Sequence, residues 1–370
     1  MRKLATIRKI SKLIPIDGAD FIELALVDGW QCIVKKGEFK VGDLGVYFEI
    51  DSMLPIDKKY SFLGKTTNDN TAEGYRIRTM KMRKELSQGL MLPLSILPPR
   101  GNMIRVDEDV TKDLGVWLYE PLMKQGSARS HSQQVGLFPS FLKKTDQERI
   151  QNKMHYFDTY KDMDWEVTTK LDGSSMTVWN NSKAGHLAAG KYAQDWRNRL
   201  ARFIELIKKY VVKPKTFGVC SRNINLKEVE GNAFWDIVNK SNLRQLLKGH
   251  NVAVQGELIG PKIQNNHEKV QRNEFYIFDI LDIDKQEYML PHERTLFLQK
   301  IDPLSTLKHV PKHGVHKVFT NRPTLKDLQA YSTGEGMNGG IREGYVFKSA
   351  TDRNLSFKCI SNKYLLRYEE

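Results

Sequence analysis

The sequence predicts an α+β protein of two domains: a small antiparallel β-barrel, then a larger domain of antiparallel sheets and helices. Three observations support this prediction. The length of 370 residues suits two domains. Residues 1–120 consist of short runs in which apolar and polar side chains alternate. Beyond residue 160, strand-like runs are interleaved with helical patterns, which is typical of an α+β domain.

The barrel is predicted from strand-like runs that recur about every ten residues. Asp28-Gly29, Lys36-Gly37 and Gly42-Asp43 supply turns between them. A helical turn is expected within 17–24. The expected strands cover 24–27, 31–34, 44–50 and 75–80.

A polar stretch without periodicity at 124–134 predicts a linker. The predicted domains are therefore residues 1–125 and 126–370. In the second domain, residues 195–210 have the apolar spacing of an amphipathic helix. Residues 234–248 suggest two shorter helices ending at Gly249. Strands are expected at 165–170, 176–179, 252–258, 275–281, 345–348 and 355–359.

Composition and charge limit the function classes. No apolar run approaches the roughly 18 residues of a membrane helix, and the N-terminus lacks the features of a signal peptide. We therefore expect an intracellular protein, cytoplasmic or nuclear. The three cysteines are far apart, which disfavours a disulfide framework or a cysteine-based zinc site. The net charge is +14, and residues 121–370 hold 39 basic against 27 acidic side chains, so we expect a polyanionic partner.

The strongest local feature is Lys170 at the end of a strand-like run, just before Asp172-Gly173. A lysine nucleophile must be neutral, and its ordinary pKa is about 10.4. Burial, a neighbouring cation or a bound metal must therefore lower that pKa. Gly173 would allow the backbone to approach a ligand closely. Taken alone, the pattern also fits a surface hairpin turn.

The segments that follow decide between these interpretations. In this order and spacing, the chain resembles the covalent nucleotidyltransferase superfamily of RNA ligases, DNA ligases and mRNA capping enzymes. The matching motifs I, Ia, III, IIIa, IV and V are 168–175 (TTKLDGSS), 221–223 (SRN), 254–260 (VQGELIG), 275–280 (FYIFDI), 343–348 (EGYVFK) and 356–358 (SFK). Within that superfamily the chain is most similar to RNA ligase family five, through residues 41–50 and 144–152 as well.

The resemblance implies an N-terminal OB-type barrel followed by an ATP-grasp-like adenylyltransferase domain. It also implies an ATP-dependent RNA ligase that seals 3′-OH/5′-phosphate breaks, in duplex nicks with an RNA 3′-OH strand. Lysyl-AMP and adenylylated RNA would be the intermediates. The expected cofactors are ATP and Mg²⁺ or Mn²⁺. The expected partner is RNA in a nicked duplex or an RNA/DNA hybrid. The protein is expected to act as a monomer and to have no membrane partner.

The resemblance also assigns roles to residues. Lys170 attacks the α-phosphate of ATP. Lys358 and Lys348 supply positive charge there and help to keep Lys170 neutral. Asp172 and two glutamates hold the metal through water, and one of these, Glu257, instead or also binds the ribose. Phe278 stacks on adenine or is plain core. The implied catalytic residues are Lys170, Lys358, Glu343 and Asp172; the implied nucleotide-binding residues are Thr169, Ser175, Arg149, Arg222, Glu257, Phe278 and Lys348; the implied metal site is Asp172, Glu257 and Glu343.

Three departures from the superfamily pattern bear on this interpretation. Lys358 lies 12 residues from the end of the sequence, which leaves no room for the OB domain that follows motif V in DNA ligases and capping enzymes. Motif I ends in Ser175 where those enzymes usually have arginine. Both departures favour an RNA ligase. Related RNA ligases often have a motif V lysine at the place of Ser356, so one phosphate contact is either missing here or supplied elsewhere, for instance by Arg353 or Lys363.

Two other functions remain open from the sequence. One is a DNA ligase or a GTP-using capping enzyme. The other is a non-catalytic OB protein that binds nucleic acid through charge and stacking. Labelling of the chain by ATP or GTP, and sealing of strands that differ in sugar, separates these alternatives.

Overall fold

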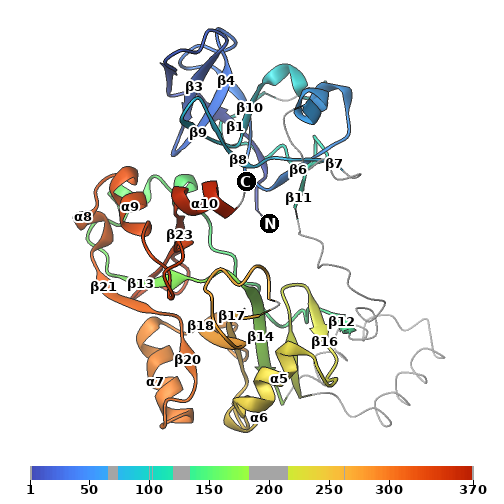
Figure 1. Cartoon of the computed structure of the whole chain (residues 1–370), viewed down its shortest axis with the longest axis vertical. Helices are drawn as coiled ribbons and strands as arrows, with labels where there is room; N and C mark the ends of the chain where they lie inside the picture. The colour runs from blue at the N-terminus through green and yellow to red at the C-terminus, as the bar shows by residue number, and fades with distance from the viewer. Residues whose placement is uncertain are drawn as a thin grey trace, which may run out of the picture.

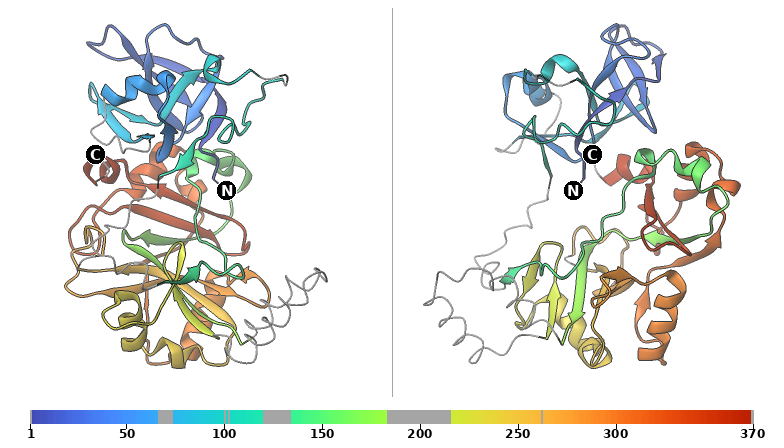
Figure 2. Two further views of the ribbon diagram at one scale, coloured as in Figure 1. Left: turned by 90° about the vertical axis from the view of Figure 1, so that its right-hand side faces the viewer. Right: turned by 180° about the vertical axis from the view of Figure 1, so that it is seen from behind.

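The computed structural model describes residues 2–65, 74–99, 101, 103–119, 134–182, 216–261 and 263–368. Figure 1 shows the N-terminal domain at one end of the long axis and the larger domain at the other, with α10 (Asn362–Tyr368) at their junction. The views of Figure 2 show the same two parts from the side and from behind.

The N-terminal domain is built from short antiparallel strands. Three sheets have the orders β1-β5-β10, β2-β3-β4 and β11-β6-β7, and β8 pairs with β9. The bounds are β1 (Ala5–Lys9), β2 (Lys12–Pro15), β3 (Ile22–Val27), β4 (Trp30–Lys35), β5 (Leu44–Phe48), β6 (Ser52–Pro55), β7 (Gly74–Arg76), β8 (Thr79–Met82), β9 (Glu85–Gln88), β10 (Leu90–Pro93) and β11 (Trp117–Leu118), with 3₁₀ turns η1 (Lys58–Lys65) and η2 (Leu94–Ile96).

The predicted strands and turns of this domain are largely confirmed. Asp28 and Gly37 have positive φ angles of 52° and 76° at the turns predicted there. The helical turn expected within 17–24 is wrong, because β3 begins at Ile22 and its side chains pack into the sheet. The run at 75–80 is divided between β7 and β8 rather than forming one strand.

The larger domain contains a large sheet of order β12-β16-β15-β14-β17-β18-β19, with β20 parallel to β18. Helices α5 (Ala233–Lys240), α6 (Leu243–Leu246) and α7 (Pro291–Ile301) pack their apolar side chains on one of its faces. The strand bounds are β12 (Gln134–Leu137), β14 (Ser174–Asn180), β15 (Phe217–Cys220), β16 (Ile224–Leu226), β17 (Val252–Ile259), β18 (Glu274–Asp282), β19 (Glu287–Tyr288) and β20 (Lys308–His309).

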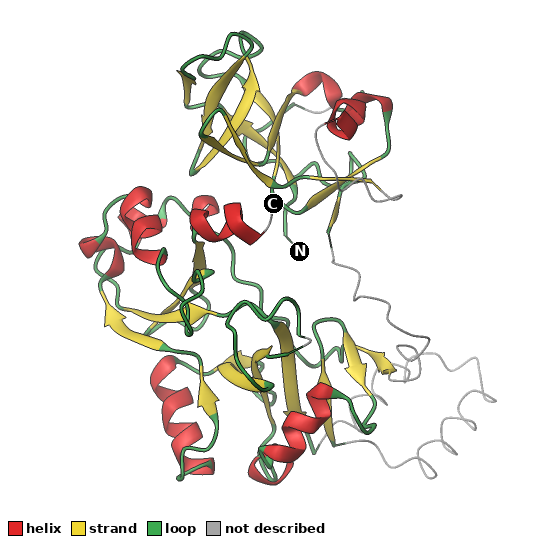
Figure 3. Ribbon diagram, viewed as in Figure 1, coloured by secondary structure: helices red, strands yellow, loops and turns green. Residues whose placement is uncertain are grey.

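A small sheet faces the large one, with the order β21-β13-β22-β23. Its bounds are β13 (Trp165–Lys170), β21 (Lys312–His316), β22 (Gly344–Ser349) and β23 (Ser356–Ile360). Aromatic side chains such as Trp165, Phe347 and Phe357 pack on one face against α2 (Tyr156–Thr159), α8 (Val318–Asn321) and α9 (Leu325–Ser332). Figure 3 shows these helices on the outer side of the small sheet.

The alternation of side chains along a strand determines what lies between the sheets. Because Trp165 and Val167 of β13 enter the aromatic core, Lys170 lies on the other face. Residues 171–173 then connect β13 directly to β14 of the large sheet. Lys170 therefore lies where the two sheets meet.

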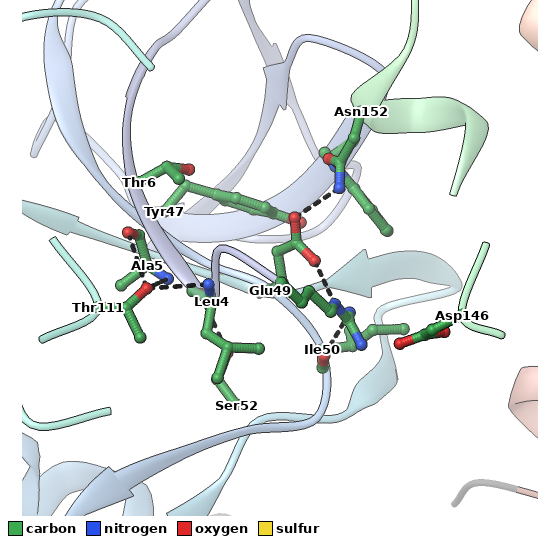
Figure 4. A network of polar contacts seen from close by, with 12 residues as sticks. Leu4, Ala5, Thr6, Tyr47, Glu49, Ile50, Ser52, Thr111, Asp146 and Asn152 are labelled. Atoms are coloured by element: carbon green, nitrogen blue, oxygen red, sulfur yellow. Dashed lines mark hydrogen bonds and ion pairs between the residues drawn. The ribbon is translucent and has the colours of Figure 1, made fainter. Parts of the chain in front are cut away.

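The two domains contact each other through the 3₁₀ turn η3 (Ile150–Asn152). The Asn152 side chain accepts a hydrogen bond from Trp30 Nε1 at 2.8 Å and donates one to Glu49 Oε1 at 2.6 Å. Arg2 Nε donates to the other oxygen of Glu49 at 2.8 Å. Figure 4 shows Asn152 directed at Glu49, with Asp146 on the far side of this network. The N-terminal domain thus anchors the segment that precedes β13.

Some predictions lie outside the described residues. These are the helix at 195–210, the domain boundary at 125/126 and the linker, of which only Gln134 is described, as the start of β12. Among the helices that the structure describes, none has the length and apolar character needed to cross a membrane.

Candidate active site

Lys170 forms an ion pair with a carboxylate at the junction of the sheets. Its Nζ lies 2.7 Å from Glu343 Oε1. Burial disfavours the ammonium, but the attraction of Glu343 and Glu257 outweighs burial, so the pKa of Lys170 is raised. Lys358 and Lys170 disfavour each other's charge, as expected, but in the protein alone the carboxylates dominate the surroundings of Lys170.

Gly173 explains how the carboxylates come together. A Cβ at this position would lie 2.4 Å from the Leu258 carbonyl oxygen and 2.6 Å from Ile259 Cγ2, so only glycine fits. The same pairing of β14 with β17 places Ser175 opposite Glu257. From the sequence, the Gly173 backbone was expected to approach a ligand closely. In the structure, it closely approaches the neighbouring strand β17.

Three carboxylates surround the single lysine: Asp172, Glu257 and Glu343 all act electrostatically on Lys170. Burial raises the pKa of Glu257 to about 8, and the repulsion of Glu343 and Asp172 adds to this against the attraction of Lys170. Such an excess of negative charge fits a cation. In the described part of the chain, no group of three or more His, Cys, Asp or Glu side chains can ligate a metal directly. The arrangement therefore fits a hydrated ion, which is held through its water shell.

Replacing Glu257 by glutamine is expected to stabilise the metal-free protein increasingly as pH rises. The pKa of Glu257 is 4.5 in the unfolded chain and about 8 in the folded protein. In the pH range between these two values, Glu257 of the folded wild type holds a proton that the unfolded chain has released. Its stability therefore falls across this window, whereas Glu257→Gln carries no such proton. Thermal unfolding with a chelator, from about pH 5 to about pH 9, should show the difference growing and then levelling near pH 8.

Glu274→Gln is the matched control. Hydrogen bonds from Lys308 and Tyr276 outweigh the effect of burial and lower the pKa of Glu274, so its glutamine variant should lose stability at neutral pH. A constant difference between wild type and Glu257→Gln at every pH would contradict the charge crowding described above.

A second cationic group lies on β23. Lys358 Nζ is 3.0 Å from Asp146 Oδ1, and the other oxygen of Asp146 is 3.6 Å from Arg222 Nη2. Burial lowers the pKa of Lys358 to about 8, with Lys170 and Arg149 contributing in the same direction against Asp146. The sequence did not single out Asp146, although it lies within the segment 144–152 that carries part of the resemblance.

Arg149 is the least satisfied cation of the site. Its side chain is buried, and neither Nε nor Nη1 has a hydrogen-bond partner. The guanidinium lies 5.9 Å from the Trp30 ring, and the Arg149 backbone forms a bridge with Lys358 of β23. A buried, incompletely paired cation beside Lys358 is suited to receive an anion.

Two predicted site residues are held elsewhere. Lys348 Nζ lies 2.7 Å from Asp279 Oδ2 and donates to the Phe278 carbonyl oxygen at 2.7 Å, so it is not part of the Lys170 cluster. The Thr169 side chain lies within 2.8 Å of His313 Nε2 on the opposite face of β13. The structure therefore brings Lys170, Asp172, Glu257, Glu343, Lys358, Arg149 and Arg222 together, but not the side chains of Lys348 and Thr169.

Phe278 and the substitutes for the absent motif V lysine can also be located. Phe278 is half-buried and packs against an apolar cluster that includes Leu171 and Tyr276, so both interpretations of its role remain compatible with its place. Arg353 is paired with Glu293 through two contacts of 2.7 Å, so, like Lys358, it would have to exchange its partner to supply that charge. Lys363 lies exposed on α10. A cavity of about 250 Å³ opens beside Asp146, Lys348 and Ser356.

Comparisons with known proteins identify this arrangement. Residues 163–363 match the family model of RNA ligases, and residues 4–94 match that of an OB-fold domain. The structure is similar to Naegleria gruberi RNA ligase with pyrophosphate, at 39% identity and a TM-score of 0.83 over 100% of this chain and 99% of that one. It is equally similar to a variant of that ligase with ATP and manganese (39%, TM-score 0.82, 100% of both chains) and to one with AMP and manganese (39%, 0.82, 98% of both). None of the curated proteins compared matches the chain.

The fold and the site thus define a ligase domain behind an N-terminal OB-fold domain. The chain belongs to the RNA ligase family. This confirms the predicted family, fold class and enzyme class.

Proposed function

We propose that the chain is an ATP-dependent RNA ligase that joins a 3′-OH to a 5′-phosphate at nicks in duplexes whose 3′-OH strand is RNA. The observation that carries the proposal is the constellation of Lys170 with Glu343, Lys358 and the incompletely paired Arg149. We propose the same division that the sequence suggests, an OB domain at 1–125 and a nucleotidyltransferase domain at 126–370, acting as a monomer.

The reaction would proceed in three phosphoryl substitutions. Neutral Lys170 Nζ attacks the α-phosphorus of ATP, a P–N bond forms and pyrophosphate leaves. An oxygen of the RNA 5′-phosphate then attacks the same phosphorus, which breaks the P–N bond and frees the lysine. Finally the 3′-OH attacks the 5′-phosphorus, its proton is lost and AMP leaves. Each step needs positive charge at the non-bridging oxygens.

The cations of the site would supply that charge. Lys358 would contact the α-phosphate after exchanging Asp146 for it, since their ion pair occupies Lys358 in the protein alone. Arg149 would bind the pyrophosphate portion, and Arg222 the nucleotide or the nicked strand. The side chains of Lys348 and Thr169 lie outside the cluster. Lys348 would hold the backbone of Phe278 in place, so that the Phe278 ring could stack on adenine. Thr169 would act only through its backbone. Ser175 would lie beside the nucleotide with Glu257, its partner across the strands.

The carboxylates fit a divalent cation, Mg²⁺ or Mn²⁺. Asp172, Glu257 and Glu343 would hold its water shell, and manganese in the complexes of the Naegleria ligase supports this role. When bound, the cation would offset the negative field that raises the pKa of Lys170 and would neutralise charge on the phosphates. Its main contribution on this chain would therefore be to make the neutral amine accessible.

The test combines labelling with a panel of nicked duplexes. With ATP and manganese we expect a covalent AMP adduct on the chain, and sealing only where the 3′-OH strand ends in ribose, because the 2′-OH distinguishes RNA from DNA. Equal sealing of deoxyribose ends would favour a DNA ligase, and labelling by GTP alone a capping enzyme. RNA binding without any adduct would favour the non-catalytic alternative.

A further inference from the structure

Two side chains outside the superfamily motifs hold Asp172. Tyr364 of α10 donates its hydroxyl hydrogen to Asp172 Oδ2 at 2.7 Å. His267, in the loop between β17 and β18, places Nε2 3.3 Å from the same oxygen. Among the described residues, the other oxygen, Oδ1, has no hydrogen-bond partner. Both side chains therefore lie against one oxygen of the carboxylate, and Tyr364 donates a hydrogen bond to it.

The Tyr364 donor is fixed in place by its own surroundings. Its backbone N–H donates to Ser361 Oγ at 3.3 Å, and the Ser361 N–H donates to the Glu343 carbonyl oxygen at 2.8 Å. The start of α10 is thereby tied to the residue that pairs with Lys170. At the same end of the helix, Asn362 Oδ1 accepts a hydrogen bond from Gln88 of the N-terminal domain at 3.2 Å.

The His267 ring is fixed as well. Its ring centroid is 4.1 Å from that of Tyr368, one turn beyond Tyr364 on α10. The side chain of the neighbouring Glu268 accepts a hydrogen bond from the Met337 N–H at 3.0 Å. The Glu268 carbonyl oxygen accepts one from the Asn338 side chain at 2.6 Å. The loop therefore presents His267 without further rearrangement.

We propose that Tyr364 and His267 are positioning residues that orient Asp172 for the hydrated metal ion. With Oδ2 held by the Tyr364 hydroxyl and flanked by the His267 ring, the carboxylate cannot rotate freely, and Oδ1 would remain available to the water shell. Groups that orient a metal-binding carboxylate typically contribute 10–100-fold to metal affinity or activity. The inference rests on the proposed function, in which Asp172 holds metal-bound water.

The test measures how lysine adenylylation depends on manganese concentration. Tyr364→Phe keeps the ring but removes the donor, and should raise the half-saturating manganese concentration about tenfold, at an unchanged half-saturating ATP concentration. Tyr368→Phe is the matched control on the same helix and should match the wild type. His267→Gln, which keeps a donor, should lie closer to wild type than His267→Phe, which keeps only the ring.

Thermal unfolding separates orientation from general damage. We expect all four variants to unfold within a few degrees of the wild type. The histidine pair serves as the second test should Tyr364→Phe fold poorly. The inference would be overturned if Tyr364→Phe and His267→Phe had the same half-saturating manganese concentration as the wild type, provided that the wild type is labelled with AMP. Absence of labelling in wild type would instead contradict the proposed function.

Discussion

Replacing Lys170 by alanine is expected to abolish transfer of AMP to the protein without unfolding it. The Lys170 side chain lies at the junction of the sheets, where it pairs with Glu343 and has Lys358 as a neighbouring cation. The neighbouring amine, Lys358, is paired with Asp146 instead. Loss of a covalent nucleophile lowers turnover by more than about 10⁴-fold, as in other enzymes that act through a covalent intermediate.

The measurement is incorporation of label from α-phosphate-labelled ATP, followed on the intact protein by mass. Lys300→Ala, on the exposed side of α7, is the control and should be labelled like wild type. Circular dichroism should show a folded variant, with a somewhat lower melting temperature because Glu343 loses its partner. Labelling of Lys170→Ala at the wild-type level would remove Lys170 from the mechanism.

The strands around the site could be predicted because their local patterns are unambiguous. The strand-like run 165–170 coincides with β13, and the runs at 252–258, 275–281 and 345–348 lie within β17, β18 and β22. Short runs of about four to eight residues, rich in apolar and β-branched side chains and bounded by turns, are consistent with buried strands. The spacing of the motifs then placed Lys170, Glu257 and Lys358 on strands, and Glu343 directly before one, that the fold brings together.

Helices α7, α9 and α10 were not predicted, because their apolar spacing is weak. The fully buried side chain of α7 is Arg294, whose partners Glu166 and Asp279 come from β13 and β18. An arginine in a core contributes nothing to an apolar pattern. The capping signal of α7, Pro291 with Glu293 two residues later, was present in the sequence and could have located its start.

Partners in the site were missed for a different reason. Asp146, His267 and Tyr364 have no signature in the chain, because each is defined by a contact with a residue more than 90 positions away. The same limit explains Lys348, whose motif position suggested a phosphate contact but whose neighbour in space is Asp279. Residue type and order predict which groups are chemically suitable, and only the fold decides which of them meet.

Replacing Arg149 by methionine is expected to stabilise the protein without ATP but to weaken its use of ATP. In the protein alone, Nε and Nη1 of this buried guanidinium lack partners, and the Trp30 ring lies 5.9 Å away. Methionine fills much of the same space without a charge. Replacing buried ionic groups by well-packed apolar side chains often stabilises a protein, by up to about 1–4 kcal/mol, so the melting temperature without ATP should rise, by about 2–4 °C for each kcal/mol gained.

ATP should reverse this advantage. If Arg149 receives the pyrophosphate portion, the variant loses a charge-assisted contact with a desolvated anion, and the half-saturating ATP concentration for adenylylation should rise more than about tenfold. Arg222→Met is the matched control, because Arg222 is exposed and already paired with Asp146, and should not stabilise the protein. If Arg149→Met had a lower melting temperature and an unchanged ATP dependence, Arg149 would have a purely structural role, packing against Trp30. The expected pair of opposite shifts would instead mean that the chain gives up stability to keep an anion site ready between its two domains.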